Sequence, residues 1–442
     1  MRILIVDDAE DKRRDVRCAL QAEFQDQYTL ELDEAVDYEE ALERLRDGFY
    51  DLVVLDLFLP DAVRSPTDDV SKALIKQVVR GDRLIPPTHI IGLTAYPLKI
   101  ECERPFYDEH LLALLHYDAV DSTWRTALCS RIRYLVASKR AAARFRLESY
   151  DFDLVVMTAR HENEYVPVAQ SLFKRKVAEE FLPWAGMVSI GEVAGPGQRP
   201  LKTALVCIGE MGMAPAAAAA SEAMNLFRPR MIAMVGMCCG FNTSVSASPR
   251  KLLDVLVARE VACWEEGKYE SDKQSGDGQF RNRAKTRLVD DAIRNQVEQT
   301  VEQASAHLTP RLRRVANTKQ YKAVAEQFDE TDIRAIPEVK FSPIVSGSSV
   351  VADDDMITEI LGRHPNALGL DMEIAGLHAA VDRCLGKKPS VLAVKGVADF
   401  GRADKGANAQ VMASRCATEV FLGIIGQLDI FEPNRSSVTK AS

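Results

Sequence analysis

The stretch VLAVKGVADFGRADK, residues 391–405, indicates how the second half of the chain folds. It begins with a run of mostly apolar residues, which predicts a buried strand, and the strand ends at Asp399. In α/β sheets, ligands bind at the carboxyl ends of parallel strands. The segment thus carries a carboxylate, Asp399, at the end of a predicted strand.

Three other segments of the same half also place acids beside apolar or small residues. They are VVMTARHENEY at 155–165, GEMGMAPAAAAASEAMNLFRPRMIAMVGMCCGF at 209–241 and GLDMEIA at 369–375. The first ends near Glu162 and Glu164, and the last carries Met372 and Glu373. Small residues in the middle segment allow a helix to pack closely on a strand and a backbone to approach a ligand. Each segment is a weak signal alone, but the order and spacing of the four together are specific.

The order and spacing of these segments resemble the superfamily of purine nucleoside phosphorylases and methylthioadenosine/adenosylhomocysteine nucleosidases. The strongest matches are FRPRMIAMVGMCCGF, LDMEIAGLHAAV and AVKGVADFGRADKG, and the resemblance covers about residues 151–430. It implies an α/β domain with a mixed central sheet that cleaves a purine N-glycosidic bond. No metal is expected at this site.

The chemistry of that bond explains why acids are needed. Its cleavage passes through an oxocarbenium-like sugar, as in glycosidases, and a purine leaves readily only when its N7 is protonated. By the resemblance, Asp399 is the general acid that donates this proton. Glu373, beside Met372, is implied to bind the ribose hydroxyls and to steady the cationic sugar.

A further carboxylate must orient the attacking water. Glu164 is favoured, because a helix then starts directly after it, as in the family. The spacing from Ala159 is one residue longer than in typical nucleosidases, so Glu162 remains the alternative.

The resemblance also implies which residues bind the base. Met237, Cys238 and the segment VSGSS at 345–349 are expected to line the base pocket, with Ser348 where many family members have an aspartate. Phosphorylases need anion-binding groups for phosphate, and the segment GEMGMAP at 209–215 contains no arginine. Water is therefore preferred to phosphate as the nucleophile.

Acids and a hydroxyl also end the strands of the first half of the chain. Apolar runs predict strands at 2–6, 51–55 and 88–93, with a short fourth strand at 119–120. Asp7, Asp8, Asp56 and Thr94 follow the first three of these runs. Three carboxylates at one sheet edge call for a divalent cation, and oxygen ligands favour Mg²⁺.

These residues resemble the receiver domain of bacterial response regulators, a flavodoxin-like fold with a parallel five-stranded sheet. The resemblance implies that Asp7, Asp8 and Asp56 hold Mg²⁺, that Asp56 accepts phosphate from a histidine phosphodonor protein, and that Thr94 is the switch hydroxyl. Receivers usually carry a lysine after the fifth strand. Here that stretch reads AVDSTWRT, with Ser122 or Thr123 near the expected place.

The chain is thus expected to be of the α/β class with two domains. The expected parts are a receiver domain at 1–136, a linker helix at 137–150, a nucleosidase-like domain at 151–430 and a disordered tail at 431–442. The net charge of −9 argues against a general nucleic-acid partner. An apolar run long enough to span a membrane is not found, so no membrane partner is expected.

A receiver joined to a nucleosidase resembles the effectors of the bacterial anti-phage phosphorelay Detocs. That resemblance implies a cytoplasmic homo-oligomer that cleaves ATP, with dATP as a further candidate, into adenine and ribose 5′-triphosphate. The alternatives are a nucleosidase or phosphorylase acting on a small nucleoside, such as methylthioadenosine or adenosylhomocysteine, and a non-catalytic nucleotide-binding adaptor.

An ATP substrate requires positive charge near the ribose 5′ end. Arg281 and Arg283 are the first candidates, from the stretch RNRAKTR at 281–287. Further candidates are Lys285, Arg287, Arg160, Arg402 and Lys405.

Overall fold

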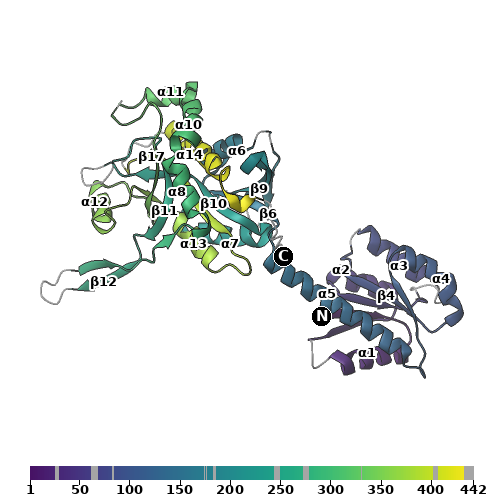
Figure 1. Cartoon of the computed structure of the whole chain (residues 1–442). Coiled ribbons are helices and arrows are strands. Elements are labelled where there is room, and N and C mark those ends of the chain that lie inside the picture. Colours follow the sequence, from purple (N-terminus) through teal and green to yellow (C-terminus); the bar gives the residue numbers. More distant parts are fainter. Residues whose placement is uncertain are drawn as a thin grey trace, which may run out of the picture. The chain divides into compact units, whose positions relative to one another are not determined.

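The computed structural model describes residues 1–24, 29–60, 68–81, 84–173, 175, 177–182, 186–242, 249–271, 278–329, 331–401 and 407–432. The chain divides into two compact units, Met1–Arg144 and Phe145–Ser442 (Figure 1). The division falls within the segment 137–150, which the sequence predicts as a linker helix.

The N-terminal unit has a parallel sheet with the strand order β2-β1-β3-β4-β5. Its elements are β1 (Arg2–Val6), α1 (Glu10–Phe24), β2 (Glu31–Ala35), α2 (Tyr38–Asp47), β3 (Leu52–Leu55), α3 (Asp68–Arg80), β4 (His89–Thr94), α4 (Pro97–Glu109), β5 (Ala113–His116) and α5 (Thr123–Glu148). The predicted parallel five-stranded sheet is confirmed.

Both faces of this sheet are covered, because side chains alternate along each strand. Along β1, Leu4 and Val6 pack into one apolar cluster with residues of α2, α3 and α4. Ile3 and Ile5 pack into a second cluster with residues of α1 and α5. Continuous apolar runs are typical of parallel strands buried on both faces.

For this unit, one predicted strand was wrong and one strand was missed. No strand forms at 119–120, where Val120 is 96% exposed, and β5 lies instead at Ala113–His116. The strand β2 was not predicted, because its sequence ELDEA is mostly acidic. It lies at the edge of the sheet, where only Ala35 is buried. Glu31 is exposed, whereas Asp33 and Glu34 are half-buried and form ion pairs with arginines.

The C-terminal unit is built around a mixed sheet, in which ten of the described strands are connected. Its elements are β6 (Phe152–Thr158), the π-helix η1 (His161–Tyr165), α6 (Val166–Leu172), β7 (Glu179–Leu182), β8 (Gly186–Ala194), η2 (Pro196–Gln198), β9 (Pro200–Cys207), α7 (Met213–Phe227), β10 (Pro229–Gly240), β11 (Val255–Cys263), β12 (Gly267–Ser271), β13 (Gly278–Asn282), β14 (Arg287–Leu288), α8 (Asp291–Glu302), α9 (Ala304–His307), α10 (Thr309–Ala316), α11 (Lys319–Ala325), β15 (Val339–Ser346), α12 (Asp354–Arg363), β16 (Gly369–Asp371), α13 (Ile374–Asp382), β17 (Ser390–Asp399), α14 (Ala407–Ile425) and η3 (Asp429–Phe431). The predicted mixed central sheet is confirmed.

Strands β6, β10 and β17 run parallel at the centre of this sheet. Figure 1 shows α7 and α13 on one side of them and α14 on the other. Two glycines set the packing distance of these helices. A Cβ at Gly376 of α13 would overlap the carbonyl oxygen of Met213 in α7, and one at Gly396 of β17 would overlap that of Ala413 in α14. The small residues noted in the sequence therefore bring the helices close to the sheet.

The end of the chain also differs from expectation in part. The tail was predicted to be disordered from residue 431, but Asp429–Phe431 forms a short 3-10 helix and Phe431 is buried. Residues 433–442 lie outside the described residues. Among the described helices, none combines the length and apolarity that crossing a membrane requires.

Candidate active site

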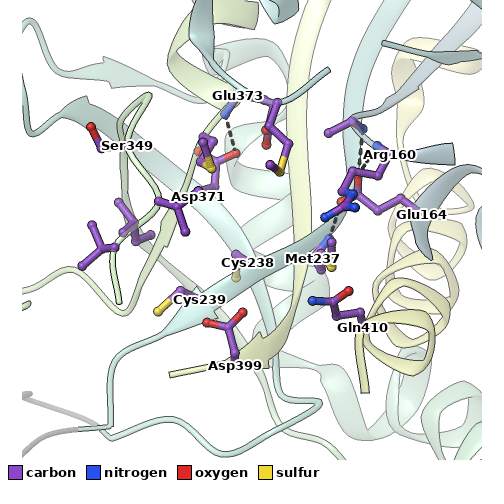
Figure 2. A pocket seen from close by; sticks show the side chains of 16 residues that line it. Arg160, Glu164, Met237, Cys238, Cys239, Ser349, Asp371, Glu373, Asp399 and Gln410 are labelled. Carbon is purple, nitrogen blue, oxygen red and sulfur yellow. Dashed lines mark hydrogen bonds between the residues drawn. The ribbon is translucent and has the colours of Figure 1, made fainter. Parts of the chain in front are cut away.

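A cavity of about 280 Å³ opens where β6, β10, β16 and β17 end. Figure 2 shows Glu164, Glu373 and Asp399 arranged around it. The complete lining is Ala159, Arg160, Glu164, Met211, Met237, Cys238, Cys239, Ser349, Val350, Val351, Leu370, Asp371, Met372, Glu373, Asp399 and Gln410. The structure thus brings Glu164 together with two acids, Glu373 and Asp399, that lie more than 200 residues later in the sequence.

Glu164 is held by three backbone N–H groups. Its Oε2 accepts from Ala159 at 2.7 Å and from Arg160 at 2.9 Å, and its Oε1 accepts from Met237 at 2.8 Å. The π-helix η1 makes this possible, because its wider turn accommodates the additional residue between Ala159 and the acid. Glu164 is 1% exposed and lines the cavity, whereas Glu162 is exposed and does not. Of the two acids, Glu164 is therefore the one that faces the cavity.

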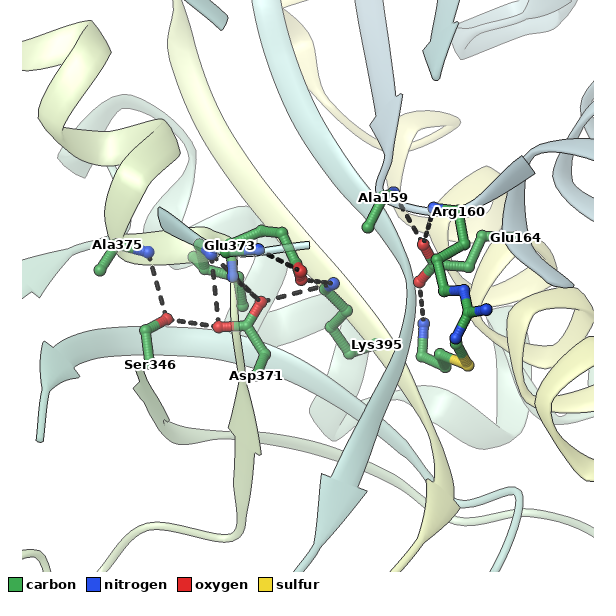
Figure 3. A network of polar contacts seen from close by, with 11 residues as sticks. Ala159, Arg160, Glu164, Ser346, Asp371, Glu373, Ala375 and Lys395 are labelled. Carbon is green, nitrogen blue, oxygen red and sulfur yellow. Dashed lines mark hydrogen bonds and ion pairs between the residues drawn. The ribbon is translucent and has the colours of Figure 1, made fainter. Parts of the chain in front are cut away.

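Glu373 belongs to a buried ionic network that Figure 3 shows. The ammonium of Lys395 lies 3.2 Å from Glu373 Oε2 and 3.4 Å from Asp371 Oδ2. Asp371 also accepts hydrogen bonds from the Glu373 and Ile374 N–H groups and from the Ser346 hydroxyl. The carboxylate of Asp371 is thereby held by the start of α13 and the end of β15, next to Glu373.

Burial dominates the protonation of Glu373. Removal from water raises its pKa to about 7, although Lys395 acts in the opposite direction. Burial acts to lower the pKa of Lys395, but the carboxylates of Glu373 and Asp371 outweigh it, so the pKa of Lys395 is raised and its ammonium stays charged. Glu373 can therefore change its charge near neutral pH while its lysine partner does not.

Asp399 ends β17 beside the neighbouring strand β10. A bulge at Cys238/Cys239 brings Cys239 opposite Asp399 in the register of the two strands. Asp399 Oδ1 accepts a hydrogen bond from Gly401 N–H at 2.9 Å. Its position places a carboxyl group on the opposite side of the cavity from Glu373 (Figure 2).

The base-binding residues expected from the sequence fall mostly at the cavity. Met237, Cys238 and Met372 line it. Burial raises the pKa of Cys238, which keeps its thiol neutral. Ser349 lines the cavity rather than Ser348, whose backbone N–H is bound by the carboxylate of Glu265.

The predicted phosphate-binding arginines lie elsewhere. Arg281 and Arg283 do not line the cavity, and both pair with Glu270 beside the hairpin β12–β13. Arg402 and Lys405 fall outside the described residues. Within the described lining, Arg160 is the one cationic side chain.

Sequence reasoning missed Asp371 and Lys395. The signal for Lys395 was present, since a lysine interrupts the apolar run VLAVKGVA, where a charge needs a buried partner. Alternation along β17 directs its side chain to the sheet face that α13 covers, because Val391 and Ala393 pack there.

The three predicted metal-binding acids of the N-terminal unit also lie close together. One carboxylate oxygen each from Asp7, Asp8 and Asp56 lies within 4.8 Å of the others. Three oxygens at such spacing suit a hard cation such as Mg²⁺, so the donor set fits the metal that the receiver resemblance implies. Burial raises the pKa of Asp56 to about 6, although Lys12 acts to lower it. Thr94 is buried at the end of β4.

The side chain found beside Asp56 is a lysine from an unexpected element. Lys12 of α1 donates to Asp56 Oδ1 at 2.7 Å, and neither Ser122 nor Thr123 takes this place. Ser122 is exposed, and the Thr123 hydroxyl bonds Asp121. After β5 comes Tyr117, whose ring centroid lies 5.7 Å from the Lys12 ammonium.

The chain belongs to the phosphorylase superfamily, because the model of that family matches residues 154–421. A curated relative, the uncharacterized protein y4jS of Sinorhizobium fredii, is 22% identical over 441 residues and aligns with 97% of this chain and 99% of its own. That similarity extends over both units.

Solved structures similar to this chain include two methylthioadenosine/S-adenosylhomocysteine nucleosidases. The nucleosidase of Colwellia psychrerythraea, solved with adenine, is 16% identical with a TM-score of 0.43, and the match covers 64% of this chain and 98% of that one. The nucleosidase of Neisseria meningitidis, solved with methylthio-immucillin-A, is 15% identical with a TM-score of 0.43, over 62% of this chain and 100% of that one.

Proposed function

We propose that the C-terminal unit is a nucleosidase that hydrolyses the N-glycosidic bond of ATP to adenine and ribose 5′-triphosphate. The observation that carries this proposal is the meeting of Asp399, Glu373 and Glu164 around one cavity. An acid for the leaving group, an acid for the sugar and an acid for the water are the three groups that the reaction requires.

The proposed reaction balances as a hydrolysis. Asp399 donates a proton to purine N7 while the bond between C1′ and N9 breaks and its electron pair passes to the base. Glu164 accepts a proton from the water that attacks C1′, so one water is consumed and adenine is released. The three N–H groups that bind Glu164 fix the direction from which that water approaches.

Glu373 is proposed to stabilise the sugar as positive charge develops on it. Glu373 is 4% exposed, so its carboxylate lies in an environment of low dielectric constant. Its interaction with a cation is stronger there than in water. Lys395 favours the ionised form of Glu373, because its ammonium contacts the same carboxylate. The ionised form is the one that accepts hydrogen bonds from both ribose hydroxyls.

Arg160 supports a phosphorylated substrate. It follows β6 directly, lines the cavity beside Glu164 and, among the described residues, has no acid bound to its guanidinium. A guanidinium of this kind binds phosphate oxygens through charge-assisted hydrogen bonds. Arg160 is the single cation of the described lining, and a triphosphate usually requires more than one. We also propose a homo-oligomer, as the resemblance to the superfamily implies, in which a partner copy contributes to the site.

A small nucleoside is the second candidate substrate. Met211, Val350 and Val351 give part of the cavity an apolar lining, which suits an uncharged 5′ substituent such as a methylthio group. The two candidate substrates differ in their need for Arg160, because only a phosphorylated substrate would bind its guanidinium.

The N-terminal unit is proposed to be a receiver that controls this activity in the bacterial cytoplasm. Asp56 would accept a phosphoryl group from a histidine phosphodonor, with Mg²⁺ held by Asp7, Asp8 and Asp56 neutralising charge on the transferred group. Thr94 would then bind the new phosphoryl group. The biological role that this arrangement supports is an anti-phage effector that removes ATP when a phosphorelay is triggered.

A substrate panel tests the catalytic part of the proposal. Purified protein is incubated with ATP, dATP, adenosine, inosine and methylthioadenosine, with and without inorganic phosphate, and free base is measured by chromatography. Release of adenine from ATP without a phosphate requirement is expected. A strict requirement for phosphate would make the protein a phosphorylase, and release from methylthioadenosine alone would establish the second candidate.

A further inference from the structure

The ammonium of Lys12 lies among the acids Asp7, Asp8 and Asp56 of the N-terminal unit, which we call the acid cluster. Its ammonium lies 2.7 Å from Asp7 Oδ2, 2.7 Å from Asp56 Oδ1 and 2.6 Å from the carbonyl oxygen of Leu93. An ammonium has three N–H donors, and here each has an acceptor. The lysine side chain is 6% exposed, so the arrangement is a built site and not a surface ion pair.

The same two carboxylates would be ligands of a divalent cation. Asp7, Asp8 and Asp56 offer one oxygen each within 4.8 Å of one another, and these are the oxygens that would hold Mg²⁺. An ammonium that donates to two of these carboxylates would then lie close to the ion and repel it. The ammonium and the divalent cation therefore compete for Asp7 and Asp56.

Asp8 is the residue at which a divalent cation from solvent can begin to replace the Lys12 ammonium. It is the exposed member of the cluster, whereas Asp7 and Asp56 are buried, and its carboxylate has no bound partner among the described residues. A cation from solvent can contact Asp8 first, while Lys12 still holds the other two acids. Lys12 has a flexible four-carbon side chain on the first turns of α1, so its ammonium can leave the acids without a change in the fold.

We propose that Lys12 is a tethered cation that must be displaced from the acid cluster before Mg²⁺ binds, and that it thereby sets when Asp56 becomes available as a phosphoryl acceptor. With Lys12 in place, Asp56 Oδ1 is bound by the ammonium. When Mg²⁺ takes over Asp7 and Asp56, the ammonium is released and becomes free to contact an incoming phosphoryl oxygen. This inference depends on the proposed metal site of the receiver but not on nucleosidase activity.

The first test is calorimetric titration of the full chain with Mg²⁺. Lys12→Met removes the competing charge while retaining an unbranched side chain, and we expect at least about ten-fold tighter binding of Mg²⁺. Arg14→Met is the matched control, because Arg14 is an exposed cation of the same helix that pairs with Asp11 and does not contact the cluster. Its Mg²⁺ affinity should stay within about two-fold of the wild type.

The second test uses the wild type and does not depend on how the variant folds. Lysines are acylated with a limiting amine-reactive reagent, with and without Mg²⁺, and modification is quantified by peptide mass spectrometry. Lys12 should become several-fold more reactive with Mg²⁺, while the exposed Lys99 is unchanged. Equal Mg²⁺ affinity of the wild type and Lys12→Met, or an unreactive Lys12 at a Mg²⁺ concentration that saturates the wild type, would overturn the inference.

Discussion

Replacing Lys395 by methionine tests the electrostatics of the proposed ribose site. The ammonium lies 3.2 Å from Glu373 Oε2 and 3.4 Å from Asp371 Oδ2, and its side chain is 0% exposed. At an effective dielectric constant of about 20, a charge pair at 3.2 Å interacts by about 5 kcal/mol. Removing one partner of a buried pair costs about 3–5 kcal/mol, because the other charge stays buried. We expect Lys395→Met to lower the free energy of unfolding by this amount at pH 8.

The sign of the pH dependence follows from Glu373. Its pKa in the folded protein is raised to about 7, so its favourable contribution to stability is complete below its ordinary pKa of 4.5 and is lost as the pH rises through 7. Without Lys395 the ionised form becomes still less favourable. The loss of stability in the variant should therefore be smaller at pH 5.5, where Glu373 is protonated, than at pH 8.

Activity provides the second readout of the same variant. If ionised Glu373 stabilises the sugar cation, kcat rises with pH through about 7 in the wild type. In Lys395→Met this rise should move upward by about two to four pH units, since about 3–5 kcal/mol is lost and one unit corresponds to 1.36 kcal/mol.

The matched control is Lys268→Met, which removes a lysine that is 57% exposed from its pair with Glu270. It should cost less than about 1 kcal/mol. Urea unfolding at both pH values measures stability, and initial rates from pH 5.5 to 9.5 measure activity. A loss below about 1 kcal/mol at pH 8 together with an unmoved pH profile would refute the reasoning.

Three further predictions concern single residues. Gly236→Ala should lower kcat about 10²-fold with little change in melting temperature, because a Cβ there would overlap Glu164 Oε1 and displace the acid; normal kinetics would contradict this role of Glu164. Arg160→Met should raise KM for ATP about 10–100-fold and leave KM for adenosine unchanged, and equal effects on both substrates would exclude Arg160 from phosphate binding. Asp56→Asn should abolish the phosphoryl adduct that a small-molecule phosphodonor forms with the wild type, as measured by intact mass, and persistence of the adduct would place the acceptor elsewhere.

The fold could be predicted where continuous apolar runs in the sequence indicate buried strands. Apolar runs such as RILIV and LVVL form strands buried on both faces, so pattern alone identified the parallel sheet of the N-terminal unit. The strand β2 was missed because its acids, two of which are half-buried in ion pairs with arginines, give no apolar run. Short strands of this kind are held by their neighbours rather than by their own composition.

The site was predictable only as far as its strand ends. Glu373 and Asp399 were predicted because the motifs LDMEIAGLHAAV and AVKGVADFGRADKG resemble those of the superfamily, and both residues lie at strand ends, where α/β proteins place ligands. The choice between Glu162 and Glu164 depended on a π-helix, which one additional residue in a short loop does not reveal. Lys12 was missed because its position on α1 gives no sign that its ammonium crosses to β3.

The central claim is that the C-terminal unit cleaves ATP under the control of the N-terminal unit. The most direct measurement is chromatography of ATP incubated with the full chain, with and without beryllofluoride and Mg²⁺, beside an Asp399→Asn control. We predict adenine and ribose 5′-triphosphate from the wild type, more of both with beryllofluoride, and neither from the control. Intact ATP under every condition would contradict the account.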